Sequence, residues 1–225
     1  MEDYRIGFFI DGFTLKRVNE YYRYYHPYRS RLNFKGLKSW VRAEAAQVFR
    51  PRGRVSMEAH YYHPYKDPKA RGWHTSGILR FEQQIAEAGI QVHYSESYID
   101  SQYNPNMALL DDAVVFSCYR KLDAIVLLST QGQYSSLPER VAPYNVPVLL
   151  LGWNFSYLKN DSLVTWRTDT ALKDRSSYYV AMDKVVENLV EGDPLRFGIF
   201  QRQRQLVKNF FAGGSVDKVI SGRAS

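Results

Sequence analysis

An aspartate and a polar segment each follow an apolar run that has the length of a buried strand. Asp11 comes directly after the run Ile6–Ile10, and Ser129–Gln133 follows the run Ala124–Leu128. Ligands of parallel α/β sheets bind beyond the carboxyl ends of the strands, so these segments meet if the two strands are neighbours. A carboxylate there is a ligand for a hard cation such as Mg²⁺ or Mn²⁺. The alternative for Asp11 is a structural role, because Asp-Gly is a common turn pair and Asp also caps helices.

Basic and tyrosine side chains are concentrated shortly after Asp11. The cations are Lys16, Arg17, Arg23, Arg29 and Arg31, and Tyr24 and Tyr25 lie among them. Guanidinium groups contact phosphates and tyrosine rings stack on bases, so this segment is the best candidate in the sequence for a nucleic-acid surface. The alternative is a solvated helix face with tyrosines in the core.

The composition favours a polyanionic partner and a reducing compartment. The net charge is +7 and the pI about 9.3, a balance that favours phosphate contacts. A lone Cys118 cannot form an internal disulfide, and the first residues lack the pattern of a signal peptide. No apolar run is long enough to span a membrane. We therefore expect a cytoplasmic protein without a membrane partner.

Patterns of strand and helix alternate along the chain. Apolar or alternating runs predict strands at 6–10, 55–61, 90–94, 124–128 and 146–151, and helical spacing predicts helices at 34–49, 75–88, 106–119 and 137–141. This order predicts a doubly wound α/β fold with a mostly parallel sheet. The pattern changes after Gly152, and we expect one domain over 1–157 and a mainly helical extension over 158–225 with a frayed tail.

The run Phe9-Ile10-Asp11-Gly12-Phe13 resembles the opening strand and turn of the NYN/LabA-like branch of the PIN nuclease superfamily. The helix at 106–119, the strand at 123–129 and the strand ending in Leu151-Gly152-Trp153 follow the order of that family, so the resemblance covers about residues 4–157. It implies a three-layer α/β/α sandwich and a site in which acidic side chains hold divalent metal for phosphodiester hydrolysis.

The chain departs from the family at most of the acidic positions. Asp11 matches the first acid, and Asp112, beside Asp111, matches the acid inside the middle helix. The other family positions hold Thr14, Asn106, Gln131 and Gln133. Amide side chains offer carbonyl oxygens without charge, so the resemblance implies that Mg²⁺ or Mn²⁺ is held weakly, through Asp11 and Asp112.

These observations predict binding of nucleic acid, RNA above DNA, by a nuclease-like domain with weak or absent catalysis. One alternative is an active metal-dependent ribonuclease that uses Asp11 with Asp111 or Asp112. Another is a protein-interaction or assembly subunit in which the fold is a scaffold, with a homo-oligomer or a protein partner bound through the C-terminal extension. The histidines lack zinc-like spacing, although His60 and His63 beside Tyr62 suit an acid–base role.

Overall fold

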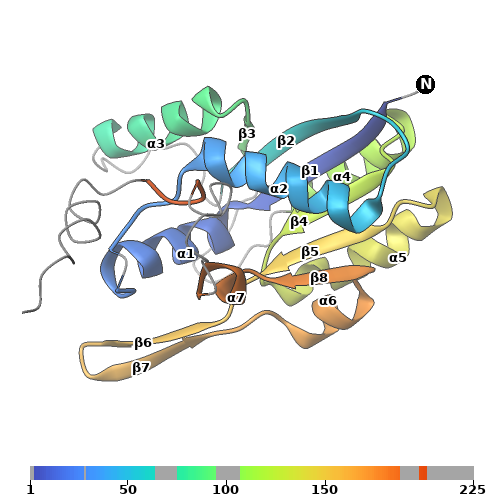
Figure 1. The fold of residues 1–225 in the computed structure, drawn as a ribbon. Coiled ribbons are helices and arrows are strands. Elements are labelled where there is room, and N and C mark those ends of the chain that lie inside the picture. Colours follow the sequence, from blue (N-terminus) through green and yellow to red (C-terminus); the bar gives the residue numbers. More distant parts are fainter. Residues whose placement is uncertain (1–2, 28, 64–74, 95–106, 188–197, 202–225) are drawn as a thin grey trace, which may run out of the picture.

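A six-stranded parallel sheet forms the centre of the molecule (Figure 1). The computed structural model describes residues 3–27, 29–63, 75–94, 107–187 and 198–201. The strands are β1 (Tyr4–Asp11), β2 (Val55–His63), β3 (Gln91–Tyr94), β4 (Ala124–Leu128), β5 (Val148–Gly152) and β8 (Tyr178–Ala181). They lie in the order β3-β2-β1-β4-β5-β8, and every neighbouring pair is parallel. The predicted parallel α/β sheet is confirmed.

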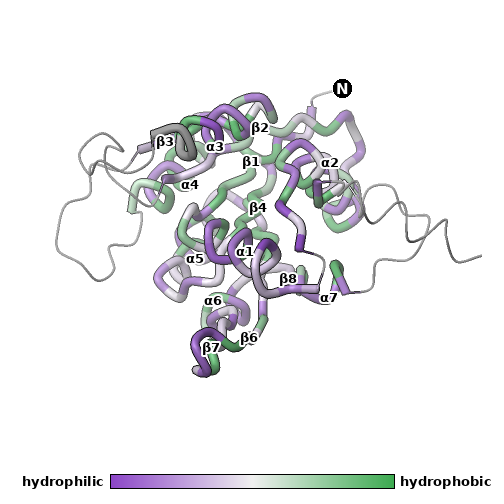
Figure 2. The backbone as a smooth tube through the Cα atoms, turned by 90° about the vertical axis from the view of Figure 1, so that its left-hand side faces the viewer, coloured by the Kyte–Doolittle hydropathy of each residue, from purple (hydrophilic) through white to green (hydrophobic). Residues whose placement is uncertain are grey.

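Helices cover both faces of this sheet and complete a three-layer α/β/α sandwich. One face packs against α1 (Gly12–Tyr24), α2 (Phe34–Phe49), α3 (Thr75–Glu87) and α7 (Met182–Glu187). The other face packs against α4 (Met107–Tyr119), α5 (Leu137–Val141) and α6 (Thr170–Arg175). In Figure 2, α4 and α5 lie on one side of β1 and β4 and α2 lies on the other, and these central strands are coloured mainly as apolar.

The central strands are buried because their residues are apolar on both faces. Ile6, Phe8 and Ile10 of β1 pack into the core beneath α1 and α2, whereas Phe9 packs into the core beneath α4. β4 and β5 are buried along their whole length. Such a strand needs helices on both sides, which the alternating chain order supplies. In the part of the chain that the structure describes, no helix is long and apolar enough to cross a membrane.

The chain after β5 differs from the predicted helical extension. β6 (Phe155–Lys159) and β7 (Ser162–Trp166) form an antiparallel hairpin, so the predicted boundary at 157 falls inside a strand. β8 then joins the main sheet beside β5, and this segment is therefore part of the same domain. The hairpin forms because Phe155, Tyr157, Val164 and Trp166 alternate with polar or exposed residues and can pack against α1.

The short segment 198–201 returns to the start of α2. The amide of Gln201 donates to the carbonyl of Arg31, and the amide of Asn33 donates to the carbonyl of Ile199, both at 2.8 Å. A Cβ on Gly36 would lie 1.7 Å from the carbonyl oxygen of Gly198, so this close approach requires a glycine. The rest of the expected tail, 188–197 and 202–225, lies outside the described residues, as does its predicted role in oligomer formation.

Candidate functional site

Asp11 lies at the carboxyl end of β1, where β1 and β4 are neighbours. The register pairs Ile10 with Leu128, which brings Asp11 beside Ser129, as the sequence predicted for adjacent strands. The side chain of Asp11 is buried and caps α1. Its oxygens accept from the amides of Phe13 and Thr14 and from the hydroxyls of Thr14 and Ser129, at 2.6–3.3 Å. The carboxylate is therefore engaged by donors of its own fold, three of them at Oδ2 and one at Oδ1.

Burial and hydrogen bonding act on this carboxyl in opposite directions. Loss of solvent raises the pKa of Asp11 above its ordinary value, and the hydrogen bonds from Thr14, Phe13 and Ser129 oppose that rise. The balance leaves a carboxyl that is harder to ionise than an exposed aspartate.

A chain of hydroxyl groups links Asp11 to the β6–β7 hairpin. The hydroxyl of Thr14 donates to Oδ2 of Asp11 at 2.6 Å and lies 3.1 Å from the hydroxyl of Thr130. The indole Nε1 of Trp166 donates to that same Thr130 oxygen at 2.9 Å. The hydroxyl of Thr14 thus both donates to Asp11 and accepts from the amide of Thr130. These bonds fix the edge of the sheet to the hairpin.

The three amide side chains that the sequence placed at this site, Gln131, Gln133 and Asn106, have different surroundings. Gln131 is buried, and its Nε2 donates to the hydroxyl of Thr130 at 3.2 Å. Gln133 belongs to the short 3-10 helix η2 (Gly132–Ser136) and is partly exposed. Asn106 lies outside the described residues. The structure thus brings Thr14 and Gln131 to the Thr130 hydroxyl, and no contact recorded among the described residues joins Gln133 to Asp11.

Asp112 lies at the other half of the carboxyl edge, the edge of the sheet at which its parallel strands end, and is held there by residues of β2 and β3. The hydroxyl of Tyr62 donates to Oδ2 of Asp112 at 2.8 Å, and Nδ1 of His93 lies 3.7 Å from the same oxygen. The rings of Tyr62 and His93 stack with centroids 4.6 Å apart. Asp111, in contrast, is exposed and lies 3.7 Å from Arg140 of α5. The two aspartates thus point to different neighbours, and neither has a recorded contact with Asp11.

His60 extends this cluster into the interior. It is 1% exposed, and its Nδ1 lies 3.0 Å from Nε2 of His93. Burial, and next the neighbouring charge of His93, lower the pKa of His60 to about 4. Burial also lowers the pKa of His93. These imidazoles are consequently neutral at physiological pH, and His63, on the opposite face of β2 beside Tyr61, does not join them.

The donor set does not fit the divalent cation that the resemblance implies. Among the described residues, no three histidine, cysteine or acidic side chains are gathered as metal ligands. Oδ2 of Asp11 accepts from three neutral donors, and Oδ2 of Asp112 accepts from Tyr62. A cation at either position would have to replace these bonds, at a cost that one or two carboxylates offset poorly.

The sequence-predicted cations of α1 are partly neutralised within the helix. Nζ of Lys16 and Nη1 of Arg17 lie 3.9 and 3.8 Å from the carboxylate of Glu20, and all three side chains are partly exposed. Arg17 also lies over the rings of Phe13 and Trp166, at 5.4 and 5.8 Å from their centroids. Its guanidinium therefore lies on the surface of α1 and also next to the carboxyl edge of the sheet.

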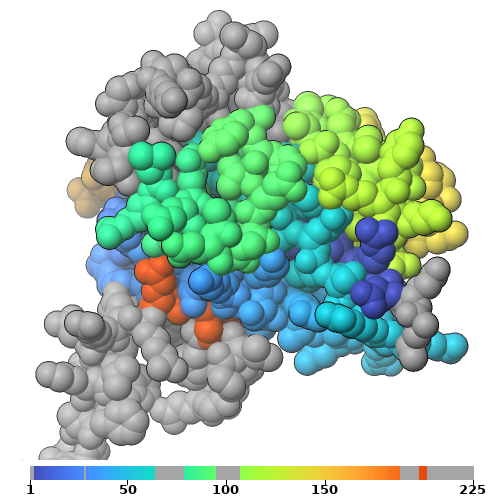
Figure 3. All heavy atoms as spheres, turned by 90° about the horizontal axis from the view of Figure 1, so that it is seen from above, coloured from blue at the N-terminus to red at the C-terminus, as the bar shows by residue number. Residues whose placement is uncertain are grey.

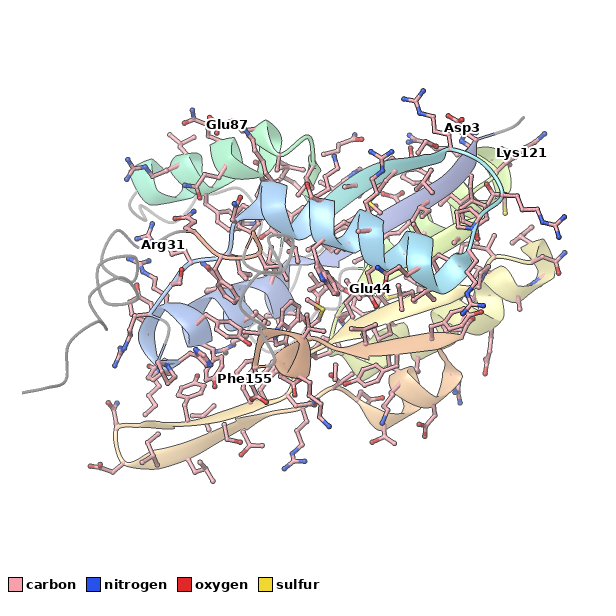
Figure 4. The ribbon with its side chains drawn as sticks, viewed as in Figure 1. Asp3, Arg31, Glu44, Glu87, Lys121 and Phe155 are labelled. Atoms are coloured by element: carbon pink, nitrogen blue, oxygen red, sulfur yellow. The ribbon has the colours of Figure 1, made fainter. Side chains whose placement is uncertain are left out.

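The other residues that the sequence predicted for the nucleic-acid surface make contacts within the fold or lie apart from one another. Tyr25 stacks on Tyr157 of the hairpin at 4.0 Å between centroids, so one of its faces is covered. Tyr24 is 46% exposed, and the guanidinium of Arg23 lies 4.6 Å from its ring centroid. Arg29 donates to the backbone carbonyl of Tyr24. Figure 4 shows Arg31 before the start of α2, away from the hairpin.

Three residues of the edge were missed by sequence reasoning. Phe13 and Trp166 pack at 5.7 Å between centroids beside Thr130, and Asp169 caps α6 by accepting from the amide of Leu172. A Cβ on Gly132 would lie 2.6 Å from Oδ2 of Asp169, so this glycine lets the carboxylate approach η2. An Asp before a helix is a capping signal. Nothing local, however, places Trp166 next to Thr130.

Comparisons with known proteins bear on the fold. No protein-family model matches it, and no curated protein matches it. The fold is similar to the crystal structure of a protein of unknown function from Vibrio parahaemolyticus, with a TM-score of 0.50 and 22% identity. The match covers 81% of this chain and 96% of that chain. A similarity of this degree bears on the fold alone. It agrees with the three-layer sandwich described above.

Proposed function

We propose that the protein binds single-stranded nucleic acid, RNA above DNA, at the carboxyl edge of its sheet, through a nuclease-like fold of the NYN/PIN kind. The observation that carries the proposal is the position of Arg17 over Phe13 and Trp166, beside the Thr130 hydroxyl. A partly exposed guanidinium next to two partly exposed rings offers phosphate contact and base stacking at one place. The net charge of +7 adds attraction for a phosphate backbone.

The same edge supports binding better than cleavage. Metal-assisted phosphodiester hydrolysis needs cations that stabilise the attacking and leaving oxygens, and carboxylates must hold them. Here Asp11 acts as a helix cap, and Asp112 accepts from Tyr62. Gln131, beside Thr130, carries no charge and does not repel phosphate. A strand can therefore approach Arg17 and the two rings without a metal ion.

The test measures binding and cleavage on the same oligonucleotide. A labelled single-stranded RNA, and DNA of matching sequence, is titrated with the protein over a series of salt concentrations, and Mn²⁺-dependent cleavage is followed by gel. We expect salt-sensitive binding, weakened by Arg17→Gln, and no cleavage that depends on Asp11. Cleavage abolished by Asp11→Asn would replace the proposal with an active nuclease. An absence of binding at low salt would leave the scaffold alternative.

A further inference from the structure

A row of cations runs along α2, away from the predicted surface on α1. Lys35, Lys38 and Arg42 recur at a spacing of three and four residues, which places them on one face of the helix. The row is about 10 Å long, because an α-helix rises about 1.5 Å per residue. Arg31, just before the helix, precedes the row by four residues.

These cations line a hollow between α2 and α3. A cavity of about 390 Å³ is bounded by Lys35, Lys38, Ser39 and Arg42 of α2, with Met57 of β2 and Glu87 at the end of α3. The two helices are in contact, and Figure 3 shows them side by side on one face of the molecule. Figure 4 shows Glu87 on α3, above α2. The hollow is thus formed by elements of the fold itself.

Neutral backbone groups hold two of the three cations in place. Nζ of Lys38 donates to the carbonyl oxygens of Gly89 and Ala88, at 2.6 and 3.3 Å, where α3 ends. Nη2 of Arg42 donates to the carbonyl oxygen of Val55 at 2.7 Å. Carbonyl groups orient these side chains but leave their charges uncompensated. Each cation also keeps further N–H donors for a ligand.

Acidic partners are scarce around this row. Within the described ranges, no ion pair involves Lys35, Lys38 or Arg42, whereas Lys16 and Arg17 of α1 both lie near Glu20. Among the described residues that line the hollow, Glu87 is the acid, and it accepts from Nε2 of Gln83 at 2.9 Å. Burial and the nearby charge of Arg42 both lower the pKa of Lys38. Positive charge is therefore crowded here, and an anion would relieve the crowding.

We propose that this α2 cation row and its hollow bind consecutive phosphate groups of a linear phosphate chain, with the backbone of single-stranded RNA as the expected source. Phosphates of one stacked strand are spaced about 3.4 Å along its axis, so the row is long enough for two or three of them. The inference does not depend on the site at Trp166, because it concerns other elements and can be tested with inorganic phosphate chains.

The central experiment compares two double variants with equal change of charge. Lys35→Gln/Arg42→Gln removes two cations of the row, and Arg52→Gln/Arg54→Gln removes two exposed cations beyond the other end of α2. Lys38 is left unchanged because it holds the end of α3. With labelled single-stranded RNA, we expect the first variant to bind about tenfold more weakly at low salt and its salt slope to fall by about 1.4, or about 0.7 for each lost phosphate contact. The second variant should lose much less.

A second arm uses inorganic tripolyphosphate as the probe and the melting temperature as the readout. Tripolyphosphate should raise the melting temperature of the parent and of Arg52→Gln/Arg54→Gln, and should raise that of Lys35→Gln/Arg42→Gln far less. If RNA binding is unchanged while this shift is lost, the site binds free polyphosphate and the RNA source is wrong. If both double variants behave alike in both arms, the inference is overturned. A parent that binds no RNA would defeat the proposed function, and the tripolyphosphate arm would still decide the α2 site.

Discussion

Helices α1 and α2 lie on the same side of the sheet, but their cations have different partners. On α1, Lys16 and Arg17 lie near Glu20, and Arg17 lies over Phe13 and Trp166. On α2, Lys38 and Arg42 donate to backbone carbonyls, which carry no charge. Positive charge is thus partly compensated on the helix that the sequence favoured and largely uncompensated on the other. The number of cations in a segment is a poorer guide to anion binding than the partners of those cations.

The comparison extends to what each helix contributes to stability. The start of α1 is fixed by buried polar contacts from Asp11, and its aromatic face packs on the hairpin, with Tyr21 stacked on Phe155 at 4.3 Å. Phe155 lies at the base of the hairpin (Figure 4). α2 is anchored by apolar residues such as Leu37 and Trp40, and its cation row lies outside that core. Substitutions of the buried residues near α1 should therefore affect folding, whereas substitution of Lys35, whose side chain has no recorded bond within the described residues, should affect mainly binding.

The largest effect is expected from Asp11→Ala. The change removes the cap of α1 and leaves the buried hydroxyls of Thr14 and Ser129 without their acceptor. Loss of a cap costs about 1 kcal/mol and each orphaned buried donor adds about 1 kcal/mol or more, so the free energy of unfolding should fall by about 3 kcal/mol. Urea denaturation measures it. Asp111→Ala, at an exposed side chain, is the control and should change it by less than about 0.5 kcal/mol. Equal stability of the two variants would show that Asp11 is not a structural cap.

The next effect concerns pH and the β2–β3 half of the carboxyl edge. His60 has a pKa of about 4 in the folded protein, below its ordinary value of 6.5. As the pH falls below 6.5, His60 becomes protonated in the unfolded chain but stays neutral in the folded protein. The contribution of neutral His60 to the free energy of unfolding is therefore fully present above pH 6.5 and is lost as the pH falls towards 4. This loss should reach about 3 kcal/mol. The raised pKa of Asp11 acts in the opposite direction, so the comparison must be made with a variant.

His60→Phe isolates the contribution of the imidazole. The ring stays between Phe9 and Phe116, and the titrating group is removed. The free energy of unfolding of parent and variant is measured by urea denaturation between pH 7 and pH 4. The parent should lose stability more steeply than the variant over this window. Parallel curves would show that the imidazole does not stay neutral on folding.

The fold was predictable because apolar runs form buried parallel strands that are covered by helices. The site was predictable only where this rule determines which strands are neighbours. The apolar runs that became β1, β4 and β5 need helices on both faces, and adjacency of β1 and β4 brings Asp11 to Ser129. The hairpin was missed because its two strands of five residues mix exposed leucines with polar residues, as at Leu158 and Leu163. Packing on α1 stabilises these strands, and a local pattern does not show such packing.

Long-range contacts explain the other omissions. Trp166 reaches Thr130 across 36 positions of the chain, and the hollow beside Lys38 is lined by residues of α2, β2 and the end of α3. The sequence predicted that Asp112 would share a site with Asp11, yet in the structure Asp112 accepts from Tyr62. Sequence spacing predicted the helix or strand that carries each of these residues. Neighbours from other elements decide what the residue contacts.

A smaller effect, on binding, is expected from Trp166→Ala. Stacking of a base on an aromatic ring contributes about 1–3 kcal/mol, so the affinity for single-stranded RNA should fall about tenfold. Trp166→Phe keeps a ring but loses the bond to Thr130, and it should retain most of the affinity. Leu163→Ala, at a side chain 69% exposed on the other face of the hairpin, is the control. Equal affinities of Trp166→Ala and Leu163→Ala would remove Trp166 from the binding site.

The smallest effect concerns the acids beside the two groups of cations. Glu20→Gln removes the carboxylate near Lys16 and Arg17, and Glu87→Gln removes the one that lines the α2 hollow. Glu20 is partly exposed and lies near two cations, and such a pair is worth up to about 1 kcal/mol. Glu87 acts on the α2 cations only as a nearby charge, and each change should raise RNA affinity by only about two- to threefold. Asp174→Asn, at an exposed residue of α6, makes the same change of net charge away from both groups and is the control.

The pattern across these three variants separates the two helices. A gain at Glu20→Gln alone would place the strand on α1, because only there would a competing carboxylate have been removed. A gain at Glu87→Gln alone would place it on α2, and gains at both would mean that one strand contacts both rows. Fluorescence anisotropy at low salt measures these gains, which should shrink as salt screens exposed charges. Equal gains in all three variants would mean that net charge governs binding and that neither row is a site.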